Sequence, residues 1–235
     1  ILSAAGAVDH DTVVAQAEEL FGSMVSRPFL TADDARFQGG ESRKTKDLEQ
    51  AHIALAFESP AYRDPNFYAA QVYSVALGGG MSSRLFQEIR EKRGLCYTIF
   101  AQTGAYSDTG MTTIYAGTSG DEIEDLANIT IDEMKRAADD MSPAEVARAR
   151  AQMKAGLLMG LESPSSRCER LARMIQIWGE VPALEDTVSR IDNVTTGDVR
   201  AFAEDLVRSA PAALALYGPV DAAPTLDTLQ QRRVA

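Results

Sequence analysis

The sequence predicts an α+β fold: a mixed or antiparallel sheet with helices packed on one of its faces. Three observations indicate this class. Segments with the two-residue alternation of strands occur in the middle and near the end of the chain, helical patterns fill most of the remainder, and glycines and prolines separate the two kinds. With 235 residues, 45% of them hydrophobic and 24% charged, the chain has the composition of a globular protein with a large core.

The first part of the chain predicts a strand and a helix followed by a linker. Ile1 to Val8 are small and mostly apolar, as in a strand. Asp9 can cap a helix whose apolar residues recur at helical spacing, and Gly22 stands where that helix would end. From Met24 to Ser42 the pattern disappears, and Pro28 interrupts it further. This stretch is long for a loop within one domain, so a domain boundary is expected inside it.

The second part alternates strands and helices. Ala51 to Glu58 has the alternation of a strand, with Ile53, Leu55 and Phe57 on one face. The elements expected after it are, in chain order, a helix from Pro65 to Leu77, a short helix from Ser82 or Ser83 to about Lys92, hairpin strands at Tyr97–Tyr106 and Met111–Gly117, helices that begin at Asp121, Ser142–Pro143, Ser163–Pro164 and Thr195, and a last strand from Ala212 to Tyr217.

Charge and cysteine content exclude several classes of function. Lys and Arg number 23 against 34 Asp and Glu, a net charge of −11. A nucleic-acid binder needs a surplus of cations, so no nucleic-acid partner is expected, whereas basic peptides remain compatible with the charge. No apolar run approaches the ~20 residues of a membrane span. Cys96 and Cys168 lack CxxC spacing and are expected to be buried free thiols.

The two histidines, His10 and His52, do not form a metal-binding motif. Neither stands in HxxEH, HExxH or HxxxH spacing, so this chain offers no recognisable histidine-based zinc site. A lone histidine needs partners to do chemistry, and His52, on the small-residue face of its strand, is therefore interpreted as structural.

Three consecutive glycines, Gly78, Gly79 and Gly80, follow the first helix of the second part. They leave backbone N–H and C=O groups open to a close partner. They also suit a helix end followed by a turn, although two of them exceed what a helix end requires.

One arginine of the next short helix has no acid three or four residues away on either side. Arg84 has Glu88 four residues later, and Glu88 has Lys92 four residues later, which predicts ordinary surface pairs. Arg90 has Phe86, Gln87, Arg93 and Gly94 at the corresponding positions. It is therefore either a solvated surface cation or a group that binds something outside the helix.

The stretch from Gly78 to Ala101, GGGMSSRLFQEIREKRGLCYTIFA, closely resembles the second-half signature of the pitrilysin/insulinase-type zinc peptidases, the inverzincins. It is most similar to the branch of the mitochondrial processing peptidase and its bacterial relatives. The segments DLEQAHIALAFESPAYRDPNFYAAQVYSVALGGG and LALYGPV resemble the same family, and AAGAVDHDTVVAQAEELFG resembles the last strand and helix of that family's preceding domain. The resemblance runs from about Ser3 to Val220.

The resemblance implies a division of labour between two similar α+β halves that enclose a peptide chamber. In this family the first half carries HxxEH, in which two histidines bind zinc and the glutamate activates a water. The second half supplies an arginine and a tyrosine seven residues apart, which by motif position are Arg90 and Tyr97. Their implied role is to hydrogen-bond the substrate near the scissile bond and to help stabilise the oxyanion. We assign substrate binding to the turn of Gly78, Gly79 and Gly80.

Because HxxEH is absent, the resemblance implies the C-terminal half of such a zinc endopeptidase. Residues 1–24 would be the tail of the catalytic domain, 25–42 a linker and 43–235 the substrate-gripping domain. Zinc would belong to the full-length parent, with none bound by this chain, which alone should be inactive. The implied partners are a peptide substrate and an HxxEH-bearing half, in the same chain or in a partner subunit, within a homodimer or heterodimer.

Two rival interpretations remain open. One is a non-catalytic scaffold subunit of the same family, and the other is an orphan half that meets its HxxEH half as a separate chain. An intact Arg90–Tyr97 pair favours the enzyme. The compartment stays open between the bacterial cytoplasm, which we favour, and the mitochondrial matrix.

Overall fold

The computed structural model describes residues 1–25, 27 and 33–235. They divide into two units. The small unit consists of Ile1–Asp34 and Lys154–Thr187, and the large unit consists of Ala35–Met153 and Val188–Ala235. The glycine turn, Arg90 and Tyr97 all belong to the large unit.

The large unit is built on a mixed sheet. Its strands are β1 Gly40–Thr45, β2 Ala51–Ser59, β3 Cys96–Ala105, β4 Gly110–Thr118 and β5 Ala212–Gly218. They lie in the order β1-β5-β2-β4-β3; β1 and β5 run parallel, and the other neighbours run antiparallel. This arrangement confirms the predicted α+β class with a mixed sheet.

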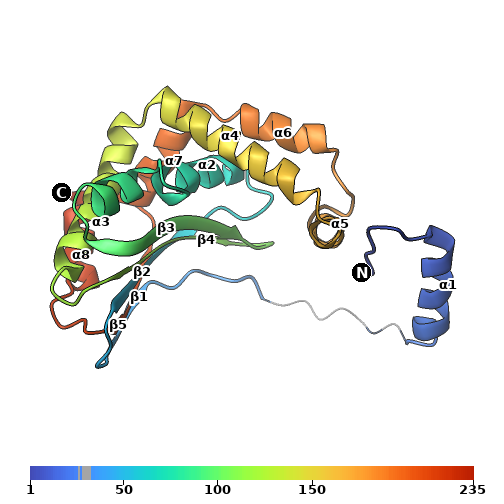
Figure 1. The fold of residues 1–235 in the computed structure, drawn as a ribbon, viewed down its shortest axis with the longest axis horizontal. Coiled ribbons are helices and arrows are strands. Elements are labelled where there is room, and N and C mark those ends of the chain that lie inside the picture. The colour runs from blue at the N-terminus through green and yellow to red at the C-terminus, as the bar shows by residue number, and fades with distance from the viewer. Residues whose placement is uncertain (26, 28–32) are drawn as a thin grey trace. The chain divides into compact units, whose positions relative to one another are not determined.

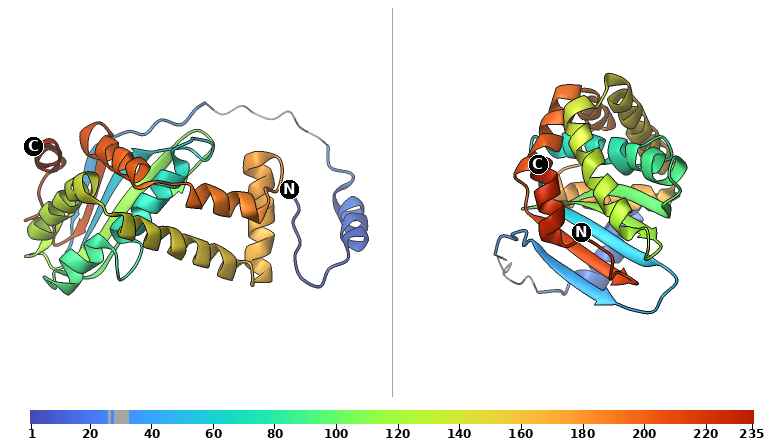
Figure 2. Two further views of the ribbon diagram at one scale, coloured as in Figure 1. Left: turned by 90° about the horizontal axis from the view of Figure 1, so that it is seen from above. Right: turned by 90° about the vertical axis from the view of Figure 1, so that its left-hand side faces the viewer.

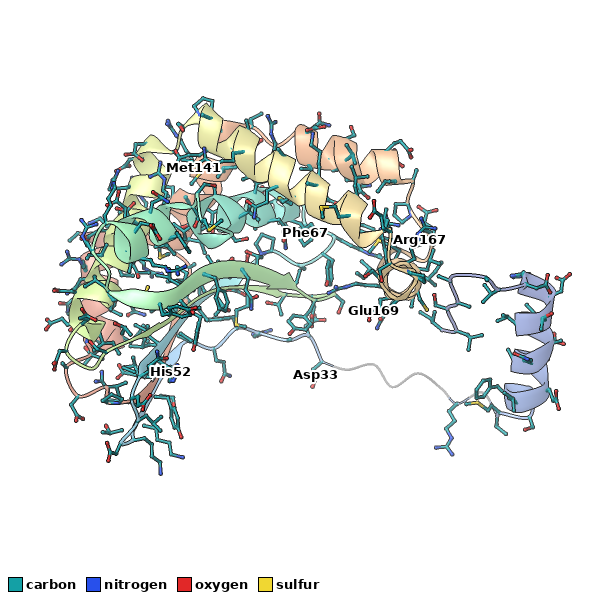
Figure 3. All side chains as sticks on the ribbon, viewed as in Figure 1. Asp33, His52, Phe67, Met141, Arg167 and Glu169 are labelled. Carbon is teal, nitrogen blue, oxygen red and sulfur yellow. The ribbon has the colours of Figure 1, made fainter. Side chains whose placement is uncertain are left out.

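Helices cover one face of that sheet. The helices of the chain are α1 His10–Phe21, α2 Phe67–Gly78, η1 Phe86–Glu91, α3 Ile123–Asp140, α4 Pro143–Gly160, α5 Pro164–Trp178, α6 Leu184–Asp192, α7 Thr196–Arg208 and α8 Leu226–Val234. Of these, α2, α3 and α7 gather over one side of the strands (Figure 1), and two further views show the same one-sided cover (Figure 2). His52 lies on the opposite face, whereas Met141 lies on the helical side (Figure 3).

The core lies between this covered face and the helices. Along β2, Ile53, Leu55 and Phe57 are buried, as their alternation predicts. From the helical side, Tyr73 and Leu77 of α2 are fully buried against them in the same cluster. Each such side chain contributes roughly 1.5–3 kcal/mol through burial of its apolar surface.

The helix start signals at Ser142, Ser163 and Thr195 are confirmed. In the capping box of α4, the Glu145 backbone N–H donates to Ser142 Oγ at 3.3 Å and the Ser142 N–H donates to Glu145 Oε2 at 2.8 Å. Thr195 forms a second capping box at α7. Ser163 caps α5, which carries Pro164 in its first turn.

Several elements differ from the prediction. Ile1 to Val8 do not form a strand, because the described residues of the small unit provide no strand with which they could pair. Conversely β1, α6 and α8 were not predicted. The strand β1 reads GESRKT, with no apolar alternation, because it lies at the edge of the sheet and is mostly exposed. It begins inside the stretch 25–42, and the division into 1–24, 25–42 and 43–235 stays a prediction; Pro28 lies outside the described residues.

The small unit contains α1, α5 and the segment before α1. Asp9 caps α1 by accepting from the Thr12 N–H at 2.9 Å, as predicted. Ser3 Oγ donates to the Cys168 carbonyl at 2.8 Å, and Cys168 Sγ donates to the Ser3 carbonyl at 3.1 Å. Both cysteines are free thiols, but only Cys96 is buried, whereas Cys168 is half-buried. None of the described helices combines the length and the apolar character needed to cross a bilayer.

Candidate functional site

The short helix η1 is a π-helix, with a turn one residue wider than that of an α-helix. The Lys92 N–H donates to the Gln87 carbonyl at 3.0 Å, which closes this wide turn. Leu85 and Ile89 are fully buried and attach the helix to the core. The sequence predicts a short helix here but not its π form. π-turns occur often at functional sites, so this local irregularity draws attention to the side chains that η1 presents.

A tight turn at Gly94 joins η1 directly to β3. Gly94 has a left-handed backbone, with φ of 68°, and its N–H donates to the Arg90 carbonyl at 3.0 Å. The next N–H, of Leu95, donates to the Ile89 carbonyl at 3.1 Å, and β3 then begins at Cys96. This tight reversal places the last turn of η1 beside the first residues of β3. It therefore explains how two residues seven apart in sequence meet in space.

Tyr97 stands at an irregularity of the sheet edge. Cys96 pairs with Thr118 and Thr98 pairs with Gly117, so Tyr97 has no partner residue on β4. Such bulges often aim a side chain out of the regular pleat. The Tyr97 side chain is 77% exposed although it is large and aromatic. It is thus presented to solvent rather than packed in the core.

The Arg90 guanidinium lies against two aromatic rings. Its Cζ atom is 4.5 Å from the centroid of the Phe86 ring and 5.2 Å from the centroid of the Tyr97 ring. Both distances are within cation–π range. Among the described residues, the Arg90 side chain makes no hydrogen bond or ion pair. The structure therefore brings the two predicted catalytic residues together and leaves the N–H donors of Arg90 without an acceptor. Phe86, the i−4 neighbour of Arg90, is a member of the arrangement that sequence reasoning missed.

The other charges of η1 are paired with one another. Glu88 accepts hydrogen bonds from Lys92 and from Arg93, and these bonds lower the pKa of its carboxyl. The predicted Glu88–Lys92 pair is confirmed. Since Glu88 is occupied by these two cations, it does not compete for Arg90.

The predicted pair of Arg84 with Glu88 is wrong. Arg84 Nε and Nη2 donate to Glu145 Oε1 and Oε2 at 2.6 and 2.9 Å, and Nη1 donates to Asp140 at 2.5 Å. Only 10% of the Arg84 side chain is exposed. Spacing along one helix could not reveal this, because both acids come from other elements: Asp140 ends α3 and Glu145 lies in the first turn of α4.

The three glycines have structural roles in the turn after α2. A Cβ atom on Gly78 would lie 2.4 Å from the Ala101 backbone nitrogen, and one on Gly79 would lie 2.6 Å from Val75 Cα. The Gly79 carbonyl accepts from Gln152 Nε2 at 2.7 Å. The Gly80 carbonyl accepts from the Ser83 backbone N–H and hydroxyl. Close packing accounts for the first two glycines, and peptide binding by the turn stays a prediction.

Comparison with known proteins places the chain in a family. A family model described as "Peptidase M16 inactive domain" matches residues 1–153. The chain belongs to the peptidase M16 family. This confirms the resemblance of the glycine-rich stretch and its neighbours, and it agrees with a C-terminal half.

Bacterial members of the peptidase M16 family resemble the chain over nearly its whole length. An "uncharacterized zinc protease" of Rickettsia bellii is 37% identical over 93% of this chain and 53% of its own length. A protein of the same description from Streptomyces coelicolor is 34% identical over 94% of this chain and 50% of its own length. YmxG of Bacillus subtilis, described likewise, is 31% identical over 93% of this chain and 54% of its own length. The chain thus spans about half the length of the curated relatives it matches.

The fold is also found in a solved assembly. A chain of "Complex III2 from Candida albicans, Inz-5 bound" superposes with a TM-score of 0.85 at 22% identity, covering 97% of this chain and 57% of that one. At this identity the likeness concerns the fold alone.

The described residues of this peptidase M16 chain do not fit a zinc ion. They contain no group of three or more His, Cys, Asp or Glu side chains placed to hold a metal. His10 lies in the small unit and His52 in the large unit. His52 Nδ1 is 2.8 Å from the Tyr115 hydroxyl, and the two rings stack with centroids 6.1 Å apart. This contact agrees with the structural interpretation of His52.

Two cavities of this peptidase M16 chain lie away from Arg90 and Tyr97. One, of about 600 Å³, is lined by α1 and the apolar residues before it in the small unit. Another, of about 590 Å³, lies in the large unit near the turn between β3 and β4. Because Tyr97 stands at the opposite end of β3 from this turn, that cavity is not part of the Arg90–Tyr97 arrangement. Neither of these two cavities is lined by Arg90 or Tyr97, and Tyr97 is largely exposed.

Proposed function

We propose that this chain is the C-terminal, substrate-gripping half of a zinc-dependent endopeptidase. Its bacterial relatives are described as zinc proteases, and the matched region spans about half of their length; both facts support this proposal. The observation that carries it is the Arg90–Tyr97 pair. Its guanidinium has no protein acceptor among the described residues, and it is stacked against a tyrosine that the fold holds out to solvent.

In this proposal the two side chains bind the peptide at the bond to be cleaved. The Arg90 guanidinium carries five N–H donors in a planar fork, and the Tyr97 hydroxyl can donate one hydrogen bond. Both would donate to the carbonyl oxygen of the scissile peptide, and these hydrogen bonds strengthen as negative charge develops there. The cation–π contact with Phe86 holds the guanidinium in place without using its donors.

The remainder of the active site would lie outside this chain. Zinc and its HxxEH ligands would belong to a first half, in the same chain or in a partner subunit. The turn of Gly78 to Gly80 would bind the peptide backbone beside the cleaved bond.

The test uses the full-length protein that contains this chain, with zinc content measured for every variant. Cleavage of an internally quenched peptide is compared for the parent, Arg90→Ala, Tyr97→Phe and Lys92→Ala. Loss of one oxyanion donor costs about 10²–10³ in rate, so Arg90→Ala and Tyr97→Phe are each expected to lower kcat by that factor at unchanged zinc content. Lys92 is the control: it lies two residues from Arg90, is 61% exposed and makes only a surface ion pair, so its replacement should leave turnover intact.

Normal cleavage by Arg90→Ala would show that Arg90 is a surface cation. If no variant, the parent included, cleaves any peptide while zinc is absent, the non-catalytic scaffold subunit becomes the better description.

A further inference from the structure

A charge cluster around the largely buried Arg84 lies just before η1 in the chain. It consists of Arg84, Asp140 and Glu145, which come from three different elements. The guanidinium of Arg84 uses three of its nitrogens on the two carboxylates, at 2.5 to 2.9 Å. Glu145 is itself fixed, because its Oε2 also accepts from the Ser142 N–H and the Ser142 hydroxyl, both at 2.8 Å. The cluster therefore joins Arg84, two residues before η1, to the end of α3 and the start of α4.

The energetics of such a cluster point to geometry rather than to stability. Removing Arg84 and Glu145 from water is unfavourable, and apolar residues of similar size often stabilise a protein as well or better. Unlike apolar packing, the forked contact of Arg84 with both oxygens of Glu145 fixes the direction as well as the position of the Arg84 side chain.

This fixed point holds the start of η1, while the buried side chains of Leu85 and Ile89 attach the helix to the core. At the other end, Gly94 reverses the chain and the Leu95 carbonyl accepts from Thr118 Oγ1 of β4. Arg90 lies between these two points and makes no ion pair of its own among the described residues. Its place over the Phe86 and Tyr97 rings therefore depends on how η1 is held.

We propose that Arg84 is a positioning residue, which through its contacts with Glu145 and Asp140 sets η1 so that Arg90 stacks over Tyr97. This inference rests on the proposed function of Arg90 for its biological meaning, but the positioning itself can be measured without activity. Arg84 touches no substrate in this scheme and acts only through the helix that follows it.

The stacking gives Arg90 a spectroscopic signature. Protons above an aromatic ring are shifted upfield, so the Arg90 Hε signal of the ¹⁵N-labelled chain should lie upfield of those of other arginines. Its disappearance in Arg90→Lys assigns it. In Arg84→Met, which keeps an unbranched side chain in the same space, we expect this upfield shift to fall by half or more while the backbone spectrum shows a folded protein. Arg84→Lys, which keeps the charge but not the fork, should restore the shift only in part.

A matched control comes from the same unit. Arg232 makes an equally forked pair with Asp132 of α3, at 2.8 and 2.7 Å, but far from η1 in sequence and on the surface. Arg232→Met removes one such pair and should leave the Arg90 signal unchanged. If Arg84→Met does not fold, Glu145→Gln replaces it: the amide keeps the size of the carboxylate and removes the charge that orients Arg84. An unshifted Arg90 signal in a folded Arg84→Met or Glu145→Gln protein overturns the proposal.

Activity separates this inference from the function on which it rests. In the full-length enzyme, Arg84→Met should lower kcat at least tenfold with little change in KM. If the Arg90 signal moves and cleavage is unaffected, Arg84 positions Arg90 but the proposed function of Arg90 fails. If the signal does not move, positioning fails, whatever the activity.

Discussion

Replacement of Gly78 by alanine tests the close contact between α2 and β3. The added methyl group would meet the backbone nitrogen of Ala101 at 2.4 Å and the Ala101 methyl group at 2.7 Å. Two effects oppose each other. Alanine is favoured over glycine within a helix by up to ~1 kcal/mol, whereas overpacking in a rigid core costs about 1–3 kcal/mol or more. Since the nearest atom belongs to the backbone of a paired strand and cannot turn aside, the clash should prevail and Gly78→Ala should destabilise the protein by about 1–2 kcal/mol.

Urea unfolding followed by circular dichroism at 222 nm measures this difference. Gly104→Ala is the matched control. Gly104 lies in β3, the strand that contains Ala101, it is exposed, and a Cβ atom there would meet nothing within 4 Å. The control should be neutral or more stable by up to ~1 kcal/mol, because glycine is unfavourable in a strand. Gly78→Ala with a midpoint equal to or above that of the parent would refute the packing explanation. The glycine turn would then need another reason, such as the binding of a peptide.

Three further predictions concern acid, thiols and metal. Burial alone would raise the pKa of Glu145, but hydrogen bonds from Arg84 and Ser142 outweigh it and lower the pKa to about 2. The stability that this carboxylate provides is thus complete above its unfolded pKa of about 4.5 and is lost as pH falls toward 2. In acid unfolding, the free energy of unfolding of a Glu145→Gln variant should therefore decline less steeply over that pH range. Burial raises the pKa of the Cys96 thiol to about 11. Iodoacetamide at pH 8 should therefore alkylate Cys168 of the native protein first. Mass spectrometry that finds Cys96 labelled equally fast would contradict the burial of Cys96. Chelator-washed and zinc-reloaded chain should retain no stoichiometric zinc by elemental analysis; one tightly held zinc per chain would disprove the assignment of zinc to another half.

Local signals predicted most elements of the fold because they act within a few residues. Capping boxes such as Ser142–Glu145 satisfy the first N–H groups of a helix whatever its surroundings, and the alternation of β2 follows from one buried face. The edge strand β1 carries no such signal, since it is polar and mostly exposed and exists because β5 provides hydrogen bonds. The segment from Ile1 to Val8 shows the converse. Its apolar residues suit a strand, but a strand needs a partner.

The candidate site was likewise predictable from the sequence only in part. Spacing identified Arg90 as a cation with no acid three or four residues away, and the motif placed Tyr97 beside it; the structure brings the two together. Arg84 was misread, because an i,i+4 acid gives only a few tenths of a kcal/mol and cannot compete with a forked, buried contact to Glu145. The π form of η1 could not be predicted, since a single wide turn depends on how both helix ends are held.

The order of the strands has a consequence for how the protein reaches its folded state. The last strand in sequence, β5, lies between β1 and β2, and Gly40 of the first strand pairs with Ala213 of the last. During synthesis the hairpin of β3 and β4 can pair with β2 as soon as it leaves the ribosome, but β1 has no neighbour until β5 is made. Contacts between such distant segments are formed slowly, because a long loop must close before they contribute. The sheet is therefore completed last by β5, which pairs with β2 on one side and gives β1 its neighbour on the other.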